Sequence, residues 1–335
     1  MRTVVFDADV LGRQRTGDET HVANLLREVG RIASGLRIVA LTRRPDLVPE
    51  GVEPYRLDAR VQEVRMALAV PRALRRLRPD LVHFQHVLPP FHGGPAVVTV
   101  HDLSFERDAS SMGRFDRLLF RTLVPRAVRR ARRVLAVSER TRRDLEELYR
   151  VPPEKIVVTP NGVDPRFAPG GSQGSYLLYV GAIEERKDPL AALDAARDAG
   201  MRLVVVGPER DGGLARRLEA GGADVRGYVE GEELARLYRE AAALVFPSRY
   251  EGFGLPVLEA MASGTPVVAT PDAAVREVAA DAALYAQPAE LGAAVRRAVA
   301  ERARLAAAGL ERARLFSWEA AARTTLAVYE EVLGS

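Results

Sequence analysis

The chain has 335 residues, of which 47% are hydrophobic and 28% charged, with a formal net charge of +4. These values are typical of a folded globular protein with room for two domains, and they exclude a disordered chain. The mild positive charge permits an anionic partner but does not indicate nucleic acid. The absence of cysteine excludes disulfides, a thiolate nucleophile and a cysteine-ligated metal site.

Short apolar runs alternate with helical patterns along the chain. Strands are expected at residues 4–10, 37–41, 81–86, 97–101, 134–137 and 156–159, then at 177–180, 203–206, 225–228, 244–246, 267–269 and 283–285. Strands separated by helices indicate right-handed βαβ units and parallel sheets. The Pro- and Gly-rich segment 160–174 marks a linker between two Rossmann-like domains, and Ser317 is a candidate N-cap for a last helix at 318–333.

No apolar run approaches the ~20 residues that a membrane-spanning helix needs. The first residues, MRTVVFDADV, lead directly into a strand and show no signal-peptide pattern, so we expect a cytoplasmic protein. Arginine-rich segments at 72–78 and 114–133 leave peripheral contact with the inner membrane face open. In the second, Phe115 and Leu118 lie among arginines, which fits a membrane-surface helix or a buried helix with a solvated basic face.

Residues that follow the strands are candidates for a site, because parallel sheets bind ligands outside the carboxyl ends of their strands. Arg186 and Lys187 follow the strand at 177–180, and Lys187 is one of only two lysines in the chain. Two cations there could neutralise a diphosphate; the alternative is that both are basic side chains of a loop exposed to solvent. His83 and His86 should face opposite sides of a strand, which disfavours a His-x-x-His metal site. His86 is a candidate acceptor contact and His83 a packing residue.

The stretch 243–270, ALVFPSRYEGFGLPVLEAMASGTPVVAT, has the pattern of a strand, a loop, a helix, a loop and a strand. Pro256 suits the first helical turn and Gly264 the C-terminal stop, so we expect a helix over 256–263. The preceding loop, 251–254 (EGFG), presents backbone amides at the positive end of the helix dipole. Such a loop suits an anionic or hydroxyl-rich ligand, although a structural strand-to-helix joint is the alternative.

Two carboxylates, Glu251 and Glu259, frame this loop. Eight helical residues separate them by roughly 12 Å, which is too far for the ~5–9.5 Å of a glycosidase pair. They are better placed to hold two parts of one long ligand. The segment EGFGLPVLE, followed by AMASGTPVV, resembles the E-x7-E signature of retaining GT-B glycosyltransferases of family 4. The resemblance implies that Glu251 lies beside the donor sugar and that Glu259 binds the ribose of the nucleotide.

The resemblance implies roles for further residues. Gly17 and Asp18 would occupy a turn near the donor phosphates, where the family more often has Gly-x-Gly; a flexible turn with Asp18 as a helix cap is the alternative. His101, in the segment HDLSF, would line the donor-sugar pocket, and Ala182 replaces an arginine that is frequent in the family. The implied catalytic set is His101, Arg186, Lys187 and Glu251, and the implied donor-binding set is Gly17, Asp18, Gly207, Gly252, Phe253, Gly254, Leu255 and Glu259.

The resemblance also implies a GT-B fold, with two Rossmann-like domains facing across a cleft. The N-terminal acceptor domain would span 1–163 and the C-terminal donor domain 171–316, with helix 317–335 crossing back to the N-terminal domain. The implied reaction moves a sugar, with retention, from a GDP-mannose- or UDP-glucose-type donor to a glycan or lipid-linked acceptor. The segment 101–105 favours a mannosyltransferase of surface-polysaccharide synthesis. Neither a cofactor nor a metal is implied.

Other functions on similar architectures remain open. A nucleotide-sugar epimerase shares the fold, and so does a phosphorylase, although neither lysine lies in an evident cofactor motif. A dehydrogenase lacks support, because no G-x-G-x-x-G follows an expected strand. A non-catalytic nucleotide-sugar-binding subunit is the alternative from another class, and donor turnover by the purified protein would distinguish it.

Overall fold

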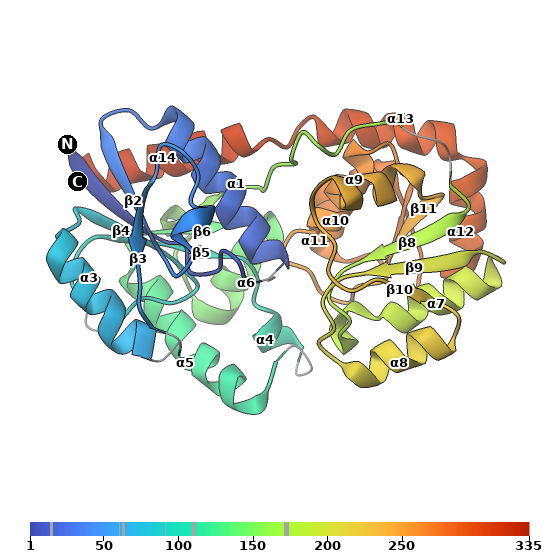
Figure 1. Cartoon of the computed structure of the whole chain (residues 1–335), viewed down its shortest axis with the longest axis horizontal. Helices are drawn as coiled ribbons and strands as arrows, with labels where there is room; N and C mark the ends of the chain where they lie inside the picture. Colours follow the sequence, from blue (N-terminus) through green and yellow to red (C-terminus); the bar gives the residue numbers. More distant parts are fainter. Residues whose placement is uncertain are drawn as a thin grey trace. The chain divides into compact units, whose positions relative to one another are not determined.

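The computed structural model describes residues 1–13, 16–59, 61, 64–90, 92–108, 112–170 and 174–334. The chain forms two compact units, each with a parallel sheet flanked by helices (Figure 1). Unit 1 consists of Met1–Leu103, Gly113–Gly162 and Trp318–Ser335, and unit 2 of Ser104–Met112 and Val163–Ser317. Among the described residues, no helix combines the length and apolarity needed to cross a membrane.

Unit 1 has a sheet of seven strands in the order β3-β2-β1-β4-β5-β6-β7, and every pairing is parallel. The strands are β1 (Arg2–Asp7), β2 (Leu36–Thr42), β3 (Glu53–Arg56), β4 (Leu81–Gln85), β5 (Ala96–Val100), β6 (Arg133–Ala136) and β7 (Ile156–Val158). Six of them were predicted. The edge strand β3 was not, because it has four residues, contains Pro54 and is mostly exposed.

The helices of unit 1 cover both faces of this sheet. They are α1 (Thr16–Ile32), α3 (Val70–Leu77), α5 (Arg114–Arg130), α6 (Glu139–Tyr149) and α14 (Trp318–Gly334), and a π-helical segment, η2 (Arg65–Ala69), leads into α3. On one face, Val82 and Phe84 of β4 pack against α3. On the other, His83 is fully buried and its Nδ1 lies 2.5 Å from the hydroxyl of Tyr329 in α14.

The last helix completes unit 1, as predicted. α14 packs beside α1 (Figure 1). The Nε2 atom of His83 lies 2.7 Å from Thr99 Oγ1, so both ring nitrogens of His83 have partners within the sheet and α14. His83 is therefore a packing residue, as expected.

Unit 2 has a sheet of six strands in the order β10-β9-β8-β11-β12-β13, also parallel throughout. The strands are β8 (Tyr176–Val180), β9 (Arg202–Val206), β10 (Asp224–Val225), β11 (Ala243–Phe246), β12 (Val267–Ala269) and β13 (Ala283–Tyr285). All six were predicted, although β10 is shorter than expected. The two sheets confirm the predicted fold of two Rossmann-like domains.

The helices of unit 2 are α4 (Ser104–Arg107), α7 (Pro189–Asp198), α8 (Gly212–Ala220), α9 (Gly231–Glu240), α10 (Leu255–Ala262), α11 (Ala273–Ala279), α12 (Leu291–Ala300) and α13 (Arg302–Ala313). On one face of the sheet, Leu177, Leu203 and Val245 pack against α7, α8 and α12. This hydrophobic core fixes the strands and therefore the loops that follow their carboxyl ends.

One local prediction is wrong. Gly17 and Asp18 were expected in a turn, but they lie in the first turn of α1, which begins at Thr16. A glycine costs a helix only about 1 kcal/mol relative to alanine, and an acidic residue in the first turn is favoured by the helix dipole. The residues just before them, 14 and 15, lie outside the described part of the chain.

Candidate functional site

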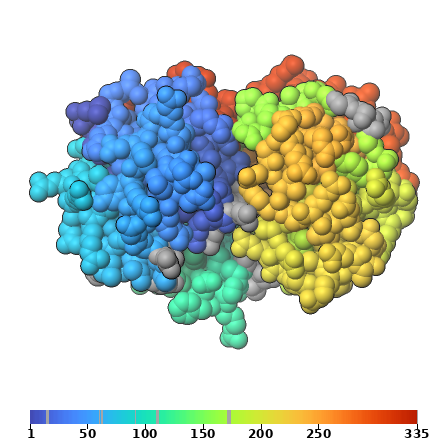
Figure 2. Space-filling view, viewed as in Figure 1, coloured from blue at the N-terminus to red at the C-terminus, as the bar shows by residue number. Residues whose placement is uncertain are grey.

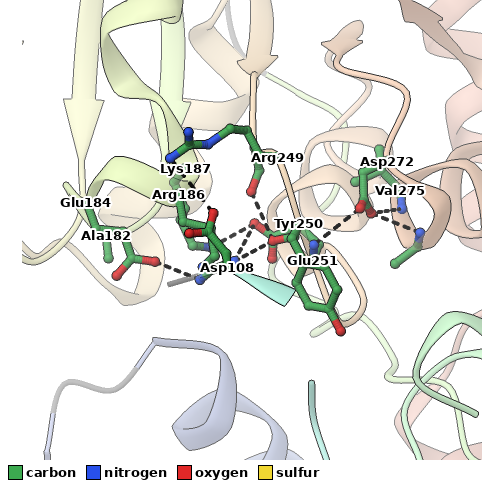
Figure 3. Close-up of polar contacts among 12 residues, drawn as sticks. Asp108, Ala182, Glu184, Arg186, Lys187, Arg249, Tyr250, Glu251, Asp272 and Val275 are labelled. Carbon is green, nitrogen blue, oxygen red and sulfur yellow. Dashed lines mark hydrogen bonds and ion pairs between the residues drawn. The ribbon is translucent and has the colours of Figure 1, made fainter. Parts of the chain in front are cut away.

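The cations predicted after β8 lie beside the first glutamate of the 243–270 stretch. Arg186 and Lys187 belong to a short 3-10 helix, η5 (Glu185–Lys187), and Glu251 lies in the loop after β11. Lys187 Nζ is 3.0 Å from Glu251 Oε1, and Arg186 Nη1 is 3.8 Å from the same oxygen (Figure 3). Side chains from two strand-end loops therefore form one largely buried, charged cluster in unit 2, in which Arg186 and Glu251 are buried and the Lys187 side chain is 13% exposed.

The two cations differ in their surroundings. The guanidinium of Arg186 is 2.7 Å from Glu184 Oε1 and donates a hydrogen bond to the carbonyl of Tyr250. The backbone of Arg186 also accepts a bond of 3.0 Å from the amide of Arg249. Arg186 thus braces the loop that carries Glu251. The ammonium of Lys187 reaches the carboxylate itself, and it also lies 5.8 Å from the centre of the Phe246 ring.

Asp272 holds the backbone of Glu251 from the other side. Its Oδ2 accepts a long bond of 3.4 Å from the amide of Glu251 (Figure 3). Its Oδ1 accepts from the amides of Ala274 at 2.9 Å and Val275 at 3.2 Å, so Asp272 is the N-cap of α11. The sequence carried a signal for this residue, since an aspartate shortly after β12 opens a helical pattern. Its contact with Glu251 depends on the fold.

The loop before α10 has the geometry that its glycines predict. Gly254 precedes the helix with φ +99°, a conformation that residues with a Cβ rarely adopt, and Pro256 lies in the first turn. The helix ends at Ala262 and Gly264 follows with φ +72°, so the predicted helix is confirmed to within a residue. Gly252, Phe253 and Leu255 are buried around the start of α10.

Glu259 is buried within α10, and the hydroxyl of Tyr238 in α9 donates a hydrogen bond of 2.8 Å to its Oε2. Burial raises the pKa of Glu259 to about 7, although the Tyr238 bond favours the ionised form; Asp164 raises the pKa further and Arg166 lowers it. At neutral pH this carboxyl is therefore divided between its two forms. A ligand that donates hydrogen bonds would favour the ionised form.

This raised pKa predicts a pH-dependent stability. Folded Glu259 keeps its proton where the unfolded chain, with a pKa near 4.5, has lost it, so stability falls as the pH rises from 4.5 to about 7. The loss should be about 3 kcal/mol. Glu259→Gln lacks this titration. The unfolding free energy of the wild type minus that of the variant, measured in urea across this range, should fall accordingly, and a constant difference would contradict the prediction.

Gly207 has a structural reason to be glycine. It lies after β9 with φ +147°, and an added Cβ would be 2.0 Å from the carbonyl oxygen of Gly181. The close approach of these two strand-end loops therefore requires a glycine at position 207, whether or not a ligand binds there. A role for Gly207 at the nucleotide remains a prediction.

The predicted His101 lies in a cluster of histidines in unit 1, after β5. Its Nε2 is 2.8 Å from Gln85 Oε1, and its ring is 4.6 Å from the ring of His21 and 5.2 Å from that of His86. Asp18 Oδ1 lies 4.0 Å from His101 Nδ1. Burial, and then the neighbouring His86, lower the pKa of His101 to about 3, so its ring is neutral at physiological pH.

Sequence reasoning missed His21, Gln85 and Tyr238. His21 Nδ1 is 2.7 Å from Asn161 Oδ1, and burial lowers the pKa of His21 to about 3. Asn161 lies in the Pro- and Gly-rich segment 160–174 and is one of two asparagines in the chain; this rarity was the signal in the sequence that could have pointed to the contact. Tyr238 and Gln85 lie within ordinary helix and strand patterns, so their contacts could not be read from the sequence.

Two family models match the chain. Residues 15–167 match Glycosyltransferase Family 4, and residues 174–301 match Glycosyl transferases group 1. The O-antigen chain mannosyltransferase B of Escherichia coli is 31% identical over 327 residues, covering 88% of this chain and 83% of that protein. The MMP alpha-(1->4)-mannosyltransferase of Mycolicibacterium hassiacum is 35% identical, covering 62% of this chain and 56% of that protein. The chain belongs to glycosyltransferase family 4 and is a glycosyltransferase.

Solved structures agree on the fold. Sucrose-phosphate synthase from Thermosynechococcus elongatus has a TM-score of 0.82 at 21% identity, with all of both chains covered. HepE from Anabaena, in complex with UDP and glucose, has a TM-score of 0.76 at 14% identity, covering 99% of this chain and all of the other. At these identities the likeness establishes the GT-B fold alone.

Proposed function

We propose that the chain transfers a sugar, with retention of anomeric configuration, from a nucleotide-diphosphate sugar to a glycan or a lipid-linked acceptor. The observation that carries this proposal is the buried cluster of Lys187, Arg186 and Glu251 on strand-end loops of unit 2. When the bond between the sugar and the diphosphate breaks, the departing nucleoside diphosphate gains negative charge. A preorganised cation at that place stabilises the charge without reorganising at the moment of reaction.

Each proposed role follows from the surroundings of the residue. Lys187 binds the diphosphate, while Arg186 holds the 249–251 loop and adds to the positive potential. Glu251, which lies beside these cations, contacts the donor sugar, with the backbone of 252–255 at the start of α10. Glu259 accepts hydrogen bonds from the ribose. His101 of unit 1, a neutral ring, lines the sugar pocket.

We propose a mannosyl donor of the GDP-mannose type, with a UDP-glucose type as the second candidate. Two relatives named above are mannosyltransferases, one of them acting on an O-antigen chain, which supports mannose and a surface-glycan acceptor. The complex of HepE with UDP and glucose keeps the second donor in consideration. We further propose that transfer needs no metal ion, because fixed cations supply the electrostatic stabilisation that a metal would otherwise give.

A panel of nucleotide sugars tests this function. The correct donor, at 100 times its Kd, should raise the unfolding free energy by about 2.7 kcal/mol. Transfer of that sugar in the presence of a chelator, with the product anomer assigned by NMR, then tests the metal and the stereochemistry. Donor turnover to a free epimer would favour an epimerase, and phosphate-dependent release of sugar phosphate would favour a phosphorylase. Binding without turnover would leave a non-catalytic subunit.

We also propose that α5 contacts the membrane that carries a lipid-linked acceptor. Its first half exposes Phe115 and Leu118, at 73% and 66%, among arginines, and projects at the lower edge of unit 1 in Figure 2. The second half of α5 buries Val124, Ala127 and Val128, which fixes the helix on unit 1. Apolar anchors with basic flanks suit an anionic surface.

Vesicle sedimentation tests this contact. The double variant Phe115→Ser, Leu118→Ser should lose binding to vesicles containing an anionic phospholipid, because both side chains leave water on binding. Leu315→Ser is the matched control, since Leu315 is 67% exposed but lies outside α5. Equal binding by the double variant and the wild type would refute the contact.

A further inference from the structure

The five histidines of the chain differ in the state of their ring nitrogens. Both nitrogens of His83 have hydrogen-bond partners, and Nε2 of His92 lies 3.5 Å from the carbonyl oxygen of Pro95. In contrast, Nδ1 of His86 and Nε2 of His21 are buried and have no hydrogen-bond partner among the described residues. A buried nitrogen without a partner costs free energy, so it calls for an explanation.

The backbone of His86 is also unusual. It follows β4 with φ +58°, one of five non-glycine residues that adopt a positive φ in the described chain. Its amide donates a bond of 2.8 Å to the carbonyl of Thr99, which holds this turn against β5. Strained backbone of this kind persists where the surrounding structure fixes it, and it is concentrated at functional sites.

Three side chains from separate elements converge at this point. Asp18 comes from α1, His86 from the turn after β4, and His101 from the turn after β5; one ligand atom of each lies within 4.8 Å of the others. His101 Nδ1 and Asp18 Oδ1 are 4.0 Å apart. Because the oxygen of Gln85 faces Nε2 of His101, that nitrogen carries the proton, and the lone pair is on Nδ1, the nitrogen that lies 4.0 Å from Asp18 Oδ1.

We propose that Asp18, His86 and His101 form a binding site for a divalent transition-metal ion of borderline softness, such as Zn²⁺ or Co²⁺. Two imidazoles and one carboxylate are a ligand set that suits these ions, with further positions open to water. The bond from His101 to Gln85 is the kind of outer contact that orients a metal-binding histidine.

Only a modest closure is needed. Zinc bonds of ~2.0–2.1 Å place tetrahedral ligand atoms roughly 3.4 Å apart, compared with 4.0 Å between His101 and Asp18 and at most 4.8 Å between any two of the three ligand atoms. The Asp18 side chain is 41% exposed. The ring of His101 is buried and bonded to Gln85, and the half-buried turn at His86 is held by its amide bond to Thr99. Sugar transfer does not require the ion. Under the proposed function, an ion bound to His101 would keep this side chain from the donor sugar and so inhibit transfer.

Cobalt absorption tests the site directly. The full chain, without a polyhistidine tag, should bind one Co²⁺ with visible d–d bands, and Zn²⁺ should displace it. His86→Asn, which tolerates the left-handed backbone, and Asp18→Asn should each weaken Co²⁺ binding by ~100-fold or more, since losing even an outer contact costs 10–100-fold. His92→Asn is the matched control and should bind as the wild type does.

Absence of cobalt bands in the wild type, or unchanged binding by His86→Asn and Asp18→Asn, would overturn the inference. Loss of binding by His92→Asn would overturn it as well, because a different set of ligands would then be at work. These outcomes do not depend on catalysis. Activity measured with and without Zn²⁺ separately tests the role of His101: bound zinc without inhibition would remove His101 from the sugar pocket and leave the metal site intact.

Discussion

Lys187→Ala should lower the rate of sugar transfer by ~10²–10³-fold, the loss typical of a donor that stabilises developing charge. The Lys187 side chain is only 13% exposed and its ammonium lies 3.0 Å from Glu251, so water cannot replace it at little cost. Binding of the nucleoside diphosphate should weaken too, because the diphosphate is the proposed partner of Lys187. Titration calorimetry and initial rates, measured on the same preparations, test both effects.

The chain offers a matched control in Lys155, its other lysine. Lys155 lies in unit 1 and donates a hydrogen bond of 2.7 Å to the carbonyl of Arg129. Lys155→Ala should bind the nucleoside diphosphate and turn over as the wild type does. If Lys187→Ala kept both properties while folding normally, Lys187 and its neighbour Arg186 would have no place in the donor site.

The two glutamates should separate into two roles. Glu251→Gln should lower the transfer rate by ~10²-fold or more while leaving nucleoside-diphosphate affinity nearly intact, because the free nucleotide lacks the sugar that Glu251 contacts. The amide keeps the shape of the side chain but loses its charge beside Lys187. Rates and affinities are to be measured above pH 7, where Glu259 is ionised.

Glu259→Gln should instead weaken binding of the nucleoside diphosphate itself. Losing a charged acceptor for the ribose hydroxyls costs about 1.5–3 kcal/mol, which is roughly 10- to 150-fold in affinity. The glutamine oxygen can still accept the bond from Tyr238, so the fold should be kept. Should Glu251→Gln lose nucleotide binding and Glu259→Gln retain it, the two assignments would be reversed.

Much of the fold could be predicted because buried parallel strands are short continuous apolar runs. β12 and β13 were predicted to the residue, since β-branched and apolar side chains end abruptly at polar or turn residues. β3 was missed because an exposed edge strand lacks that run. Gly17 and Asp18 were placed in a turn because the family has a glycine-rich loop there, but the helix that contains them is stabilised by packing against α14.

Only those parts of the candidate site could be predicted that lie at the end of an expected strand or within a family motif. Arg186, Lys187 and Glu251 follow strand ends, and strands β8 and β11 are neighbours, so their loops meet. The bond between Tyr238 and Glu259 depends on the packing of α9 against α10, which no local pattern encodes. The turn at His86 was likewise hidden, because a positive φ at histidine has no sequence signature.

The return of α14 to unit 1 determines the order in which the protein can mature during synthesis. Ribosomes add ~5–20 residues per second, and domains generally fold as they emerge. The segment Val163–Ser317, most of unit 2, is made before α14, whereas unit 1 waits for Tyr329 to cover His83. The half that is translated first is therefore completed last. A chain released at residue 317 would therefore have every residue of its C-terminal half from 163 onward, beside an N-terminal half in which His83 has lost its cover.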